Sequence, residues 1–273
     1  MSTQSQREYV LERTDNEYQR LSDQAQIWAP ATRSALARAG IAEGMHALDV
    51  GCGSGSAMRL IADAVGPSGR VTGLDCDAAL GAEALSRLRS TGPDVFEFVA
   101  GDFGASTPID GQQFELVLSR LFVVHCPEPV EALRRLWQWV KPGGVLLVME
   151  HDLTIFRTLP AHSISTRAFA LMCDLLSALG KDIEIGSRMP ELFRRAGIGV
   201  PDGCDIWSHI RSNDGGGGMV RMLLSSLRKA SLEGKYVDAI TLDQIDTELS
   251  TIAPDQFFVR WPDMVATWKR NPG

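Results

Sequence analysis

The sequence predicts an α/β protein built on a doubly wound, mostly parallel sheet of seven strands, with N-terminal helices and helical insertions. Two observations predict this fold class. Between residues 45 and 150, short apolar runs alternate with segments of helical periodicity, as in consecutive βαβ units. The first apolar run, residues 45–50, leads into Gly51-Cys52-Gly53-Ser54-Gly55, a sequence typical of a strand-to-helix turn that holds an adenine-containing ligand.

The predicted elements follow in a regular order. Two helices precede the sheet, one from residue 9 to Pro30, where proline interrupts the pattern, and one over 31–39, closed by Gly40. Strands are predicted at 45–50, 70–75, 95–100, 114–119 and 145–150, then near 203–210, with a last strand region at 257–261 and 264–269. Helices are predicted at 58–65, 78–90, 129–140, 163–179, 189–196, 219–232 and 242–252. The Lys-Pro-Gly-Gly sequence at 141–144 is predicted to be a turn.

The composition and net charge of the chain limit the class of protein and the kind of binding partner that it fits. The 273 residues are enough for one large domain or for one domain with a sizeable insertion, and the contents of 44% hydrophobic and 22% charged residues are ordinary for a globular protein. A net charge of −7 disfavours a nucleic-acid partner, which clustered Lys and Arg would bind. The five cysteines form neither a CxxC pair nor a zinc spacing, which favours reduced thiols in a cytoplasmic protein. No signal peptide and no membrane span are expected.

Three acidic residues stand at the ends of the first three predicted strands. Asp49 precedes the glycines, where a carboxylate suits a cationic group such as an ammonium. Asp75 ends the second strand, where it can accept both hydroxyls of a ribose. Asp102 ends the third strand and can accept an exocyclic adenine amine while Phe103 packs on the ring. Because the carboxyl ends of parallel strands meet at one edge of the sheet, the set indicates a site for an adenine-containing ligand.

This constellation resembles the class I S-adenosylmethionine-dependent methyltransferases, and within them the ubiquinone/menaquinone-biosynthesis type and related small-molecule enzymes, many of which act on secondary metabolites. The resemblance covers about residues 45–152. Residues 47–55 are similar to motif I, 74–75 to the ribose acid, 101–103 to the adenine motif, 114–120 to the fourth-strand motif and 140–148 to the "LKPGG" turn with the fifth strand. One departure is Glu115, which stands where the family's fourth-strand motif has Asp.

The resemblance implies an enzyme that binds S-adenosylmethionine and transfers its methyl group by in-line displacement to O, N, S or C of a small molecule. It implies a cofactor site made of Asp49, Gly51, Cys52, Gly53, Gly55, Asp75, Cys76, Asp102, Phe103, Ser119, Arg120, Gln24 and Tyr9. The glycines would hold the methionine end, Asp49 would lie near its amine, and Ser119 and Arg120 would lie along its side. Cys52 and Cys76 are expected to be small packed residues rather than nucleophiles.

Two histidines are the candidate catalytic residues. His125 follows the fourth strand, where members of the family place residues near the methyl group, and is the first candidate for a general base or substrate anchor. His151, at the end of the fifth strand, is the second. The alternative for His125 is a packed histidine that caps the next turn, and the alternative for His151 is a histidine that pairs with Asp152. No metal is expected, because the fourth strand ends without an acid and the side chains of neighbouring strand residues point to opposite faces.

The expected organisation is an N-terminal helical lid over residues 1–40 and a methyltransferase domain over 41–273. Helical insertions at about 153–187 and 211–254 are expected to cap the substrate. In look-alike enzymes the leading helices close over the cofactor, so Tyr9 or Gln24 could touch its methionine end. The helical additions could also support a homodimer.

Three other functions remain open at this point. An oxidoreductase that uses NAD would have a similar glycine turn and second-strand acid, but it does not explain Asp49 or Asp102. An enzyme that binds S-adenosylmethionine without transferring its methyl group, for example a cyclase, would keep the same glycines and acids. A non-catalytic binding or dimerisation module would be expected to lose those acids. The sequence leaves the acceptor atom open.

Overall fold

The structure is a computed structural model that describes residues 15–215 and 217–273, with side chains from residue 25 onward. The chain forms two compact units. The sheet unit consists of Leu21–Thr154, Glu184–Ser208 and Pro262–Gly273. The insert unit contains Ile155–Ile183 and His209–Trp261, together with residues 15–20.

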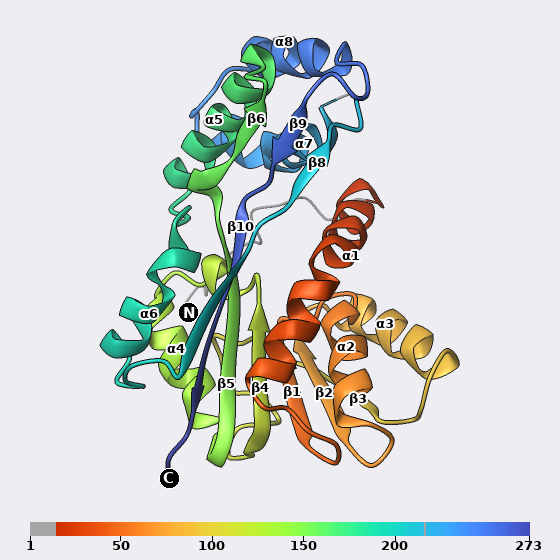
Figure 1. Cartoon of the computed structure of the whole chain (residues 1–273), viewed down its shortest axis with the longest axis vertical. Helices are drawn as coiled ribbons and strands as arrows, with labels where there is room; N and C mark the ends of the chain where they lie inside the picture. The colour runs from red at the N-terminus through yellow and green to blue at the C-terminus, as the bar shows by residue number, and fades with distance from the viewer. Residues whose placement is uncertain (1–14, 216) are drawn as a thin grey trace, which may run out of the picture. The chain divides into compact units, whose positions relative to one another are not determined.

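The sheet unit confirms the predicted seven-stranded, mostly parallel sheet. The strand order is β3-β2-β1-β4-β5-β10-β7 (Figure 1). Neighbouring strands from β3 to β5 run parallel, and β10 runs antiparallel to both β5 and β7. The strands are β1 (His46–Val50), β2 (Arg70–Asp75), β3 (Phe96–Ala100), β4 (Phe114–Arg120), β5 (Val140–Asp152), β7 (Gly203–Trp207) and β10 (Asp263–Arg270). The order reverses between β1 and β4, and open sheets of this kind bind ligands in the crevice at such a switch point.

Helices cover both faces of this sheet (Figure 1). The helices α1 (Asp15–Arg38), α2 (Ser56–Val65) and α3 (Ala78–Ser90) contribute to one apolar core with strand residues such as Leu118 and Leu147. The helices α4 (Pro129–Gln138) and α6 (Ile185–Arg195) form the opposite core with Val117 and Val148. The short 3-10 helix η1 (Val123–His125) belongs to this second face, because Val123 lies in the same core.

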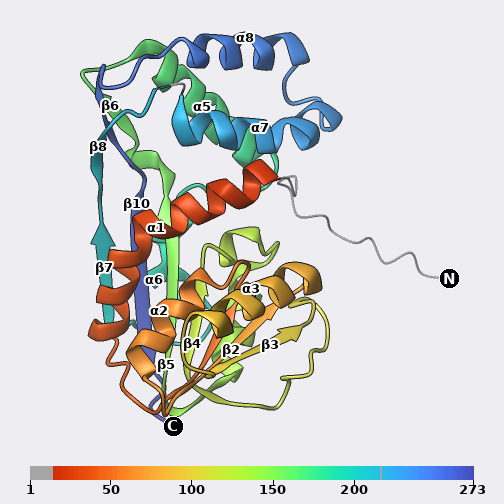
Figure 2. The same cartoon turned by 90° about the vertical axis from the view of Figure 1, so that its right-hand side faces the viewer.

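The insert unit has a small sheet of its own. Strands β6 (Arg157–Leu159), β9 (Phe258–Arg260) and β8 (Ile210–Ser212) pair antiparallel in that order, after the 3-10 helix η2 (Leu153–Ile155). Three helices pack on one another beside it (Figure 2), namely α5 (Ser163–Ala178), α7 (Gly218–Glu233) and α8 (Ala239–Ser250). None of the helices in the described part of the chain is long and apolar enough to cross a membrane.

The predicted break at Pro30 is wrong, because α1 runs through it to Arg38. Proline removes a backbone donor from the helix. Burial outweighs that loss here, since Trp28, Ala31 and Ala35 on the two sides of the proline all lie in the core of the sheet unit. The hydroxyl of Thr32 also donates to the Trp28 carbonyl oxygen at 3.0 Å, one turn earlier.

The predicted turn at 141–144 is part of β5 in the structure. The register between β4 and β5 shifts there, from Phe114 opposite Val140 to Leu116 opposite Val145. Asn271, just beyond β10, accepts a hydrogen bond from Gly143 and donates one to Gly144. A partner at the far end of the chain therefore extends the strand through these glycines.

The predicted strand near 203–210 is two strands that belong to different sheets. β7 pairs with β10 in the sheet unit, whereas β8 pairs with β9 in the insert unit. The last predicted strand region, at 257–261 and 264–269, corresponds to β9 and β10, which also belong to different sheets. Backbone pairing with distant segments decides this division, and a local pattern of apolar residues does not carry that information.

Candidate functional site

The turn after β1 is built from three glycines in the left-handed region. Gly51, Gly53 and Gly55 have φ angles of 71°, 48° and 73°, a conformation that side chains disfavour. A Cβ on Gly51 would stand 2.4 Å from Cδ2 of Phe122, so this glycine is required by close packing. A Cβ on Gly53 would meet no described atom within 4 Å, so the backbone of Gly53 faces open space. A ligand can therefore lie directly against the main chain at Gly53.

The glycine turn is tied to the end of β2. The backbone N–H of Gly53 donates to Oδ2 of Asp75 at 2.9 Å, and the N–H of Asp77 donates to Oδ1 at 2.9 Å. Each carboxylate oxygen has two acceptor positions, so one on each oxygen remains for a ligand hydroxyl. The backbone N–H of Gly51 also donates to the Leu74 carbonyl oxygen at 2.8 Å. The structure thus brings the predicted ribose acid and the glycines together.

Asp49 lies buried beside Arg120. Burial raises the pKa of Asp49 to about 7, against the opposing effect of the Arg120 charge, and the nearby Asp75 carboxylate raises it further. The Arg120 guanidinium donates to Thr32 Oγ1 at 3.1 Å and to Ser56 Oγ at 2.9 Å. Within residues 25–215 and 217–273, Asp49 Oδ2 has no hydrogen-bond partner. A buried carboxylate with one unsatisfied oxygen is suited to a cationic ligand group.

Ser119 and Arg120, which were predicted to lie along the methionine end of the cofactor, occupy opposite faces of the sheet. Arg120 bonds to α1 and α2, on the face that also holds Asp49. Ser119 pairs with Val50 and Val148, which belong to the core on the other face. Its hydroxyl is fully buried and has no hydrogen-bond partner among the described residues.

The loop after β3 carries the predicted adenine residues. Asp102 Oδ1 accepts from the Gly104 backbone N–H at 2.7 Å. The Phe103 ring packs edge-on against Phe122, with ring centroids 5.0 Å apart, and against Trp139 at 5.6 Å. The Arg135 guanidinium lies 5.3 Å from the centroid of the Phe103 ring and 5.3 Å from that of Trp139. Phe103 is thus held in place by its own neighbours.

The two cysteines near the acids differ in environment. Cys52, in the glycine turn, is buried, and Cys76, after β2, is exposed. Burial and the nearby Asp49 and Asp75 charges raise the pKa of the Cys52 thiol above its ordinary value. Its side chain is therefore neutral and packs as a small apolar group.

His125 and His151 lie on different elements. His125 ends η1, in which Val123 packs into the core on the face covered by α4 and α6. The His151 ring is 5.3 Å from the Trp28 ring of α1, on the other face. Asp152 accepts hydrogen bonds from the backbone and the hydroxyl of Thr154 and from the Ser187 hydroxyl. Each histidine is therefore tested separately as a candidate catalytic residue.

Sequence reasoning missed Glu150 and Phe122. Glu150 is 1% exposed, and its Oε1 accepts from the backbone N–H groups of Phe122, Val123 and Val124. Burial raises the pKa of Glu150 to about 8, although these N–H groups act in the opposite direction. The signal in the sequence was an acid at the end of an otherwise apolar strand, Val145 to Met149.

Two predicted residues on the leading helix are not tested by the structure. Tyr9 lies outside the described residues, and Gln24 falls within α1 without a described side chain. The described residues contain no group of three or more His, Cys, Asp and Glu side chains placed to hold a metal ion.

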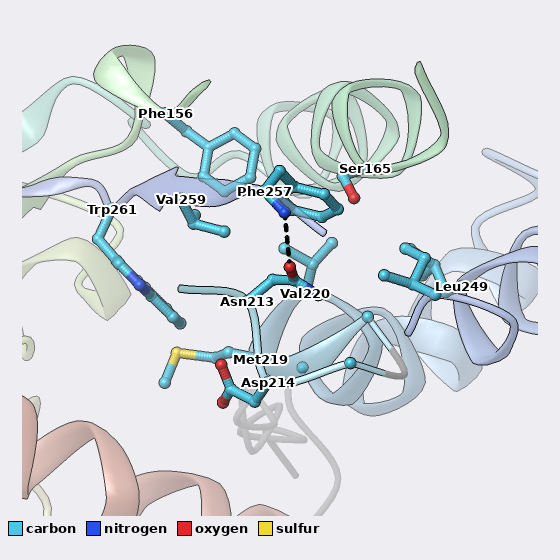
Figure 3. Close-up of a pocket in the computed structure, with 14 residues that line it drawn as sticks. Phe156, Ser165, Asn213, Asp214, Met219, Val220, Leu249, Phe257, Val259 and Trp261 are labelled. Atoms are coloured by element: carbon cyan, nitrogen blue, oxygen red, sulfur yellow. Dashed lines mark hydrogen bonds between the residues drawn. The ribbon is translucent and has the colours of Figure 1, made fainter. Parts of the chain in front are cut away.

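The insert unit contains a small pocket (Figure 3). Its volume is about 40 Å³, and Phe156, Met219, Val259 and Trp261 are among the residues that line it. One wall is fixed by Asn213, whose side-chain oxygen accepts from the Phe257 backbone N–H at 3.0 Å. Pockets that hold drug-sized ligands are larger, roughly 300–1,000 Å³, so this pocket by itself does not hold such a molecule.

Comparisons with known proteins agree with this geometry. A family model described as a methyltransferase domain matches residues 41–197. Demethylmenaquinone methyltransferase of Lactococcus lactis is 27% identical over 193 residues, which span 64% of this chain and 73% of that protein. Trans-aconitate 2-methyltransferase of Paracidovorax citrulli is 29% identical over 175 residues, which span 64% of this chain and 60% of that protein. A crystal structure of a candidate methyltransferase from Bacillus halodurans has the same fold, with a TM-score of 0.59 and 14% identity over 89% of this chain and 99% of the other.

The site fits the cofactor of this family, S-adenosylmethionine, in three respects. The unsatisfied oxygen of Asp49 suits the ammonium of its methionine end. The open space at Gly53 admits a ligand against the main chain, and Asp75 keeps acceptor positions for the ribose hydroxyls. Because a family model covers more than half of the chain, we conclude that this protein belongs to the methyltransferase-domain family, whose methyl donor is S-adenosylmethionine.

Proposed function

We propose that this chain transfers the methyl group of S-adenosylmethionine to an O, N, S or C atom of a small organic molecule by in-line displacement. The observation that carries the proposal is the Gly53–Asp75 hydrogen bond, which joins an open glycine turn to the ribose acid. The cofactor, when bound, supplies a methyl group that its sulfonium has already activated. The protein then has to align the acceptor with that methyl group.

The chain's own residues divide into binding and proton-handling roles. Gly51, Gly53 and Gly55 would hold the methionine end, and Asp75 and Asp102 would orient the ribose and the adenine. His125 is the first candidate to accept a proton from the acceptor, because it ends the short helix η1 directly after β4. A base is needed only where the acceptor carries a proton with a high pKa.

Binding is the first test. In thermal unfolding we expect S-adenosylmethionine and S-adenosylhomocysteine to raise the midpoint, because ligands that bind only the folded state stabilise it. NAD is the control ligand and should leave the midpoint unchanged. Stabilisation by NAD without stabilisation by S-adenosylmethionine would overturn the proposed cofactor.

Turnover is the second test. The names of the two curated relatives suggest a demethylated quinol and a tricarboxylate as the first acceptors to try. With a competent acceptor, labelled methyl groups should appear in the product together with equimolar S-adenosylhomocysteine. The cyclase alternative predicts conversion of a substrate with no S-adenosylhomocysteine formed. His125→Ala and His151→Ala, compared at saturating cofactor, separate the two candidate bases.

We further propose that the insert unit selects the acceptor, that residues 1–40 act as a lid, and that the enzyme works in the cytoplasm without a nucleic-acid partner. The net charge of −7 supports the last point. Action on a secondary metabolite and the formation of a homodimer stay predictions. Light scattering after size-exclusion chromatography would measure the oligomeric state. Exchanging the insert segments for those of a relative would test acceptor selection.

A further inference from the structure

Glu150 holds the turn between β4 and α4. Its Oε1 accepts from three consecutive backbone N–H groups, those of Phe122 at 2.9 Å, Val123 at 2.7 Å and Val124 at 3.4 Å. Three consecutive N–H groups that converge on one oxygen fix the place of the turn relative to the end of β5. Because Glu150 is almost wholly buried, removal of its carboxyl would leave the buried N–H of Val123 without its acceptor.

The segment that Glu150 holds is strained. Leu121, directly before it, has a φ of 56°, in the left-handed region that a leucine rarely adopts. Such a conformation persists only where the surroundings enforce it, and strained residues gather at functional sites. The hydrogen bonds to Glu150 begin at the next residue, and the Leu121 N–H donates to the Met149 carbonyl oxygen at 2.8 Å. The end of β5 therefore enforces the turn.

The same turn contacts both halves of the cofactor site through Phe122. The Phe122 ring occupies the space that a side chain on Gly51 would need. It also packs edge-on against Phe103, with ring centroids 5.0 Å apart. His125 closes the turn, and its backbone N–H donates to the Phe122 carbonyl oxygen at 2.9 Å. A displacement of Phe122 would disturb the glycine turn, the adenine loop and His125 together.

Glu150 is costly to the fold in one respect. Its second oxygen, Oε2, is buried and accepts no hydrogen bond within the described part of the chain. An apolar residue at this position would avoid that cost, as Val148 and Met149 do two positions and one position earlier in β5. The carboxyl is therefore not explained by packing of the strand alone, which favours a role through the turn that it holds.

We propose that Glu150 is a positioning residue for the methyltransferase site, a proposal that rests on the proposed function. By holding the N–H groups of Phe122, Val123 and Val124, it keeps Phe122 against Gly51 and Phe103 and sets the place of His125. Glu150 itself does not contact the reacting atoms.

The test compares Glu150→Met, which keeps the volume and removes the acceptor, with Glu150→Gln, which keeps an acceptor oxygen. We expect Glu150→Met to bind S-adenosylhomocysteine roughly tenfold more weakly or worse, by calorimetry, because hydrogen bonds from three N–H groups are lost. Hydrogen exchange should accelerate in the peptide that contains residues 122–124. Glu150→Gln should restore most of both properties. The matched control is Glu115→Gln, an acid that bonds to the His46 backbone N–H in the same sheet, and it should behave as wild type.

Each outcome decides the proposal. If Glu150→Met keeps the wild-type affinity for S-adenosylhomocysteine and the wild-type rate of hydrogen exchange, the proposal for Glu150 is overturned. The proposed function still stands in that case, because the wild-type chain binds S-adenosylhomocysteine. Loss of affinity with unchanged exchange at 122–124 would also overturn it, because Glu150 would then act by another route. Failure of the wild-type chain to bind S-adenosylhomocysteine would overturn the proposed function instead.

If Glu150→Met does not fold, Phe122→Leu provides the test. This variant should lose affinity for S-adenosylhomocysteine and should raise KM for S-adenosylmethionine more than it lowers kcat. It should also keep the protection of residues 122–124 from hydrogen exchange. Unchanged binding in that variant would overturn the proposal.

Discussion

The backbone N–H of Gly53 donates a hydrogen bond to Oδ2 of Asp75 at 2.9 Å, which joins the turn after β1 to the end of β2. A second backbone N–H, from Asp77, holds the other oxygen of the same carboxylate at 2.9 Å. The carboxylate is therefore oriented before any ligand arrives. Orientation in advance lowers the entropy lost when the ligand binds.

Replacing Asp75 should weaken cofactor binding. We expect Asp75→Ala to reduce the affinity for S-adenosylhomocysteine about 10- to 100-fold, because hydrogen bonds to a charged group contribute about 1.5–3 kcal/mol. Calorimetry measures the affinity. Asp63→Asn, on the exposed side of α2, is the control for loss of one negative charge. Equal affinities in the two variants would exclude Asp75 from the ribose site.

Alanine variants at two glycines should distinguish the cost of backbone strain from the loss of space for the ligand. Gly53 and Gly143 both have positive φ, at 48° and 79°, and a Cβ on either would meet no described atom within 4 Å. Each alanine variant should therefore lose a similar amount of unfolding free energy, about 1–2 kcal/mol. Only Gly53→Ala should also lose affinity for S-adenosylhomocysteine, roughly tenfold, because its methyl group would enter the ligand's space. Urea denaturation and calorimetry measure the two effects. A matching loss of affinity in Gly143→Ala would contradict the assignment.

Cofactor binding should strengthen as the pH rises through the pKa of Asp49. Burial raises that pKa to about 7, so the side chain is protonated below this pH and ionised above it. The ammonium of the ligand favours the ionised form, so binding should release a proton near neutral pH and become tighter from pH 6 to pH 8. Calorimetry in buffers with different heats of ionisation counts the protons. Asp49→Asn should remove both effects, and affinity of the wild type that does not change with pH would refute the ammonium contact.

The position of the loop after β3, which carries Asp102 and Phe103, should depend on Arg135 and not on its neighbour Arg134. Arg135 packs on Phe103 and Trp139 and bonds to Asp110 at 3.0 Å and to the Ala105 carbonyl oxygen. Its neighbour Arg134 bonds to Glu131 and to the Arg195 carbonyl oxygen instead. We expect Arg135→Met to weaken binding of S-adenosylhomocysteine several-fold and to speed hydrogen exchange over residues 102–111. Arg134→Met should do neither, and indistinguishable variants would show that the loop holds its place without Arg135.

The two buried carboxyls of Glu150 and Asp49 should each lower the unfolding free energy as the pH rises from about 5 to about 8. The pKa of Glu150 is raised from 4.5 to about 8 and that of Asp49 from 3.8 to about 7. Between the ordinary and the raised values, the folded chain binds more protons than the unfolded chain, so raising the pH favours unfolding. Denaturant titrations across this range measure the slope. It should be shallower in Glu150→Gln, which has no carboxyl to titrate at this position, and an unchanged slope there would assign the effect to other groups.

Local patterns in the sequence were sufficient for the parallel core of the fold and for part of the site. The strands β1, β2 and β4 are apolar runs whose type needs no knowledge of their partners. The glycine turn and Asp75 were predicted for the same reason, since a turn that requires positive φ selects glycine locally. Their hydrogen bond follows from the parallel pairing of β1 with β2.

The rest was decided by contacts between residues far apart in the chain. Pro30 remains helical because both sides of it are buried, and residues 141–144 extend a strand because Asn271 pairs with them. β6, with three residues, exists only through its pairing with β9, a hundred residues later. Glu150 was one acid among many in the sequence, and its importance came from three N–H groups that belong to a turn 26–28 residues away. Periodicity and glycine placement are properties of neighbouring residues, whereas burial, strand pairing and the partners of a buried carboxyl exist only once the chain has folded.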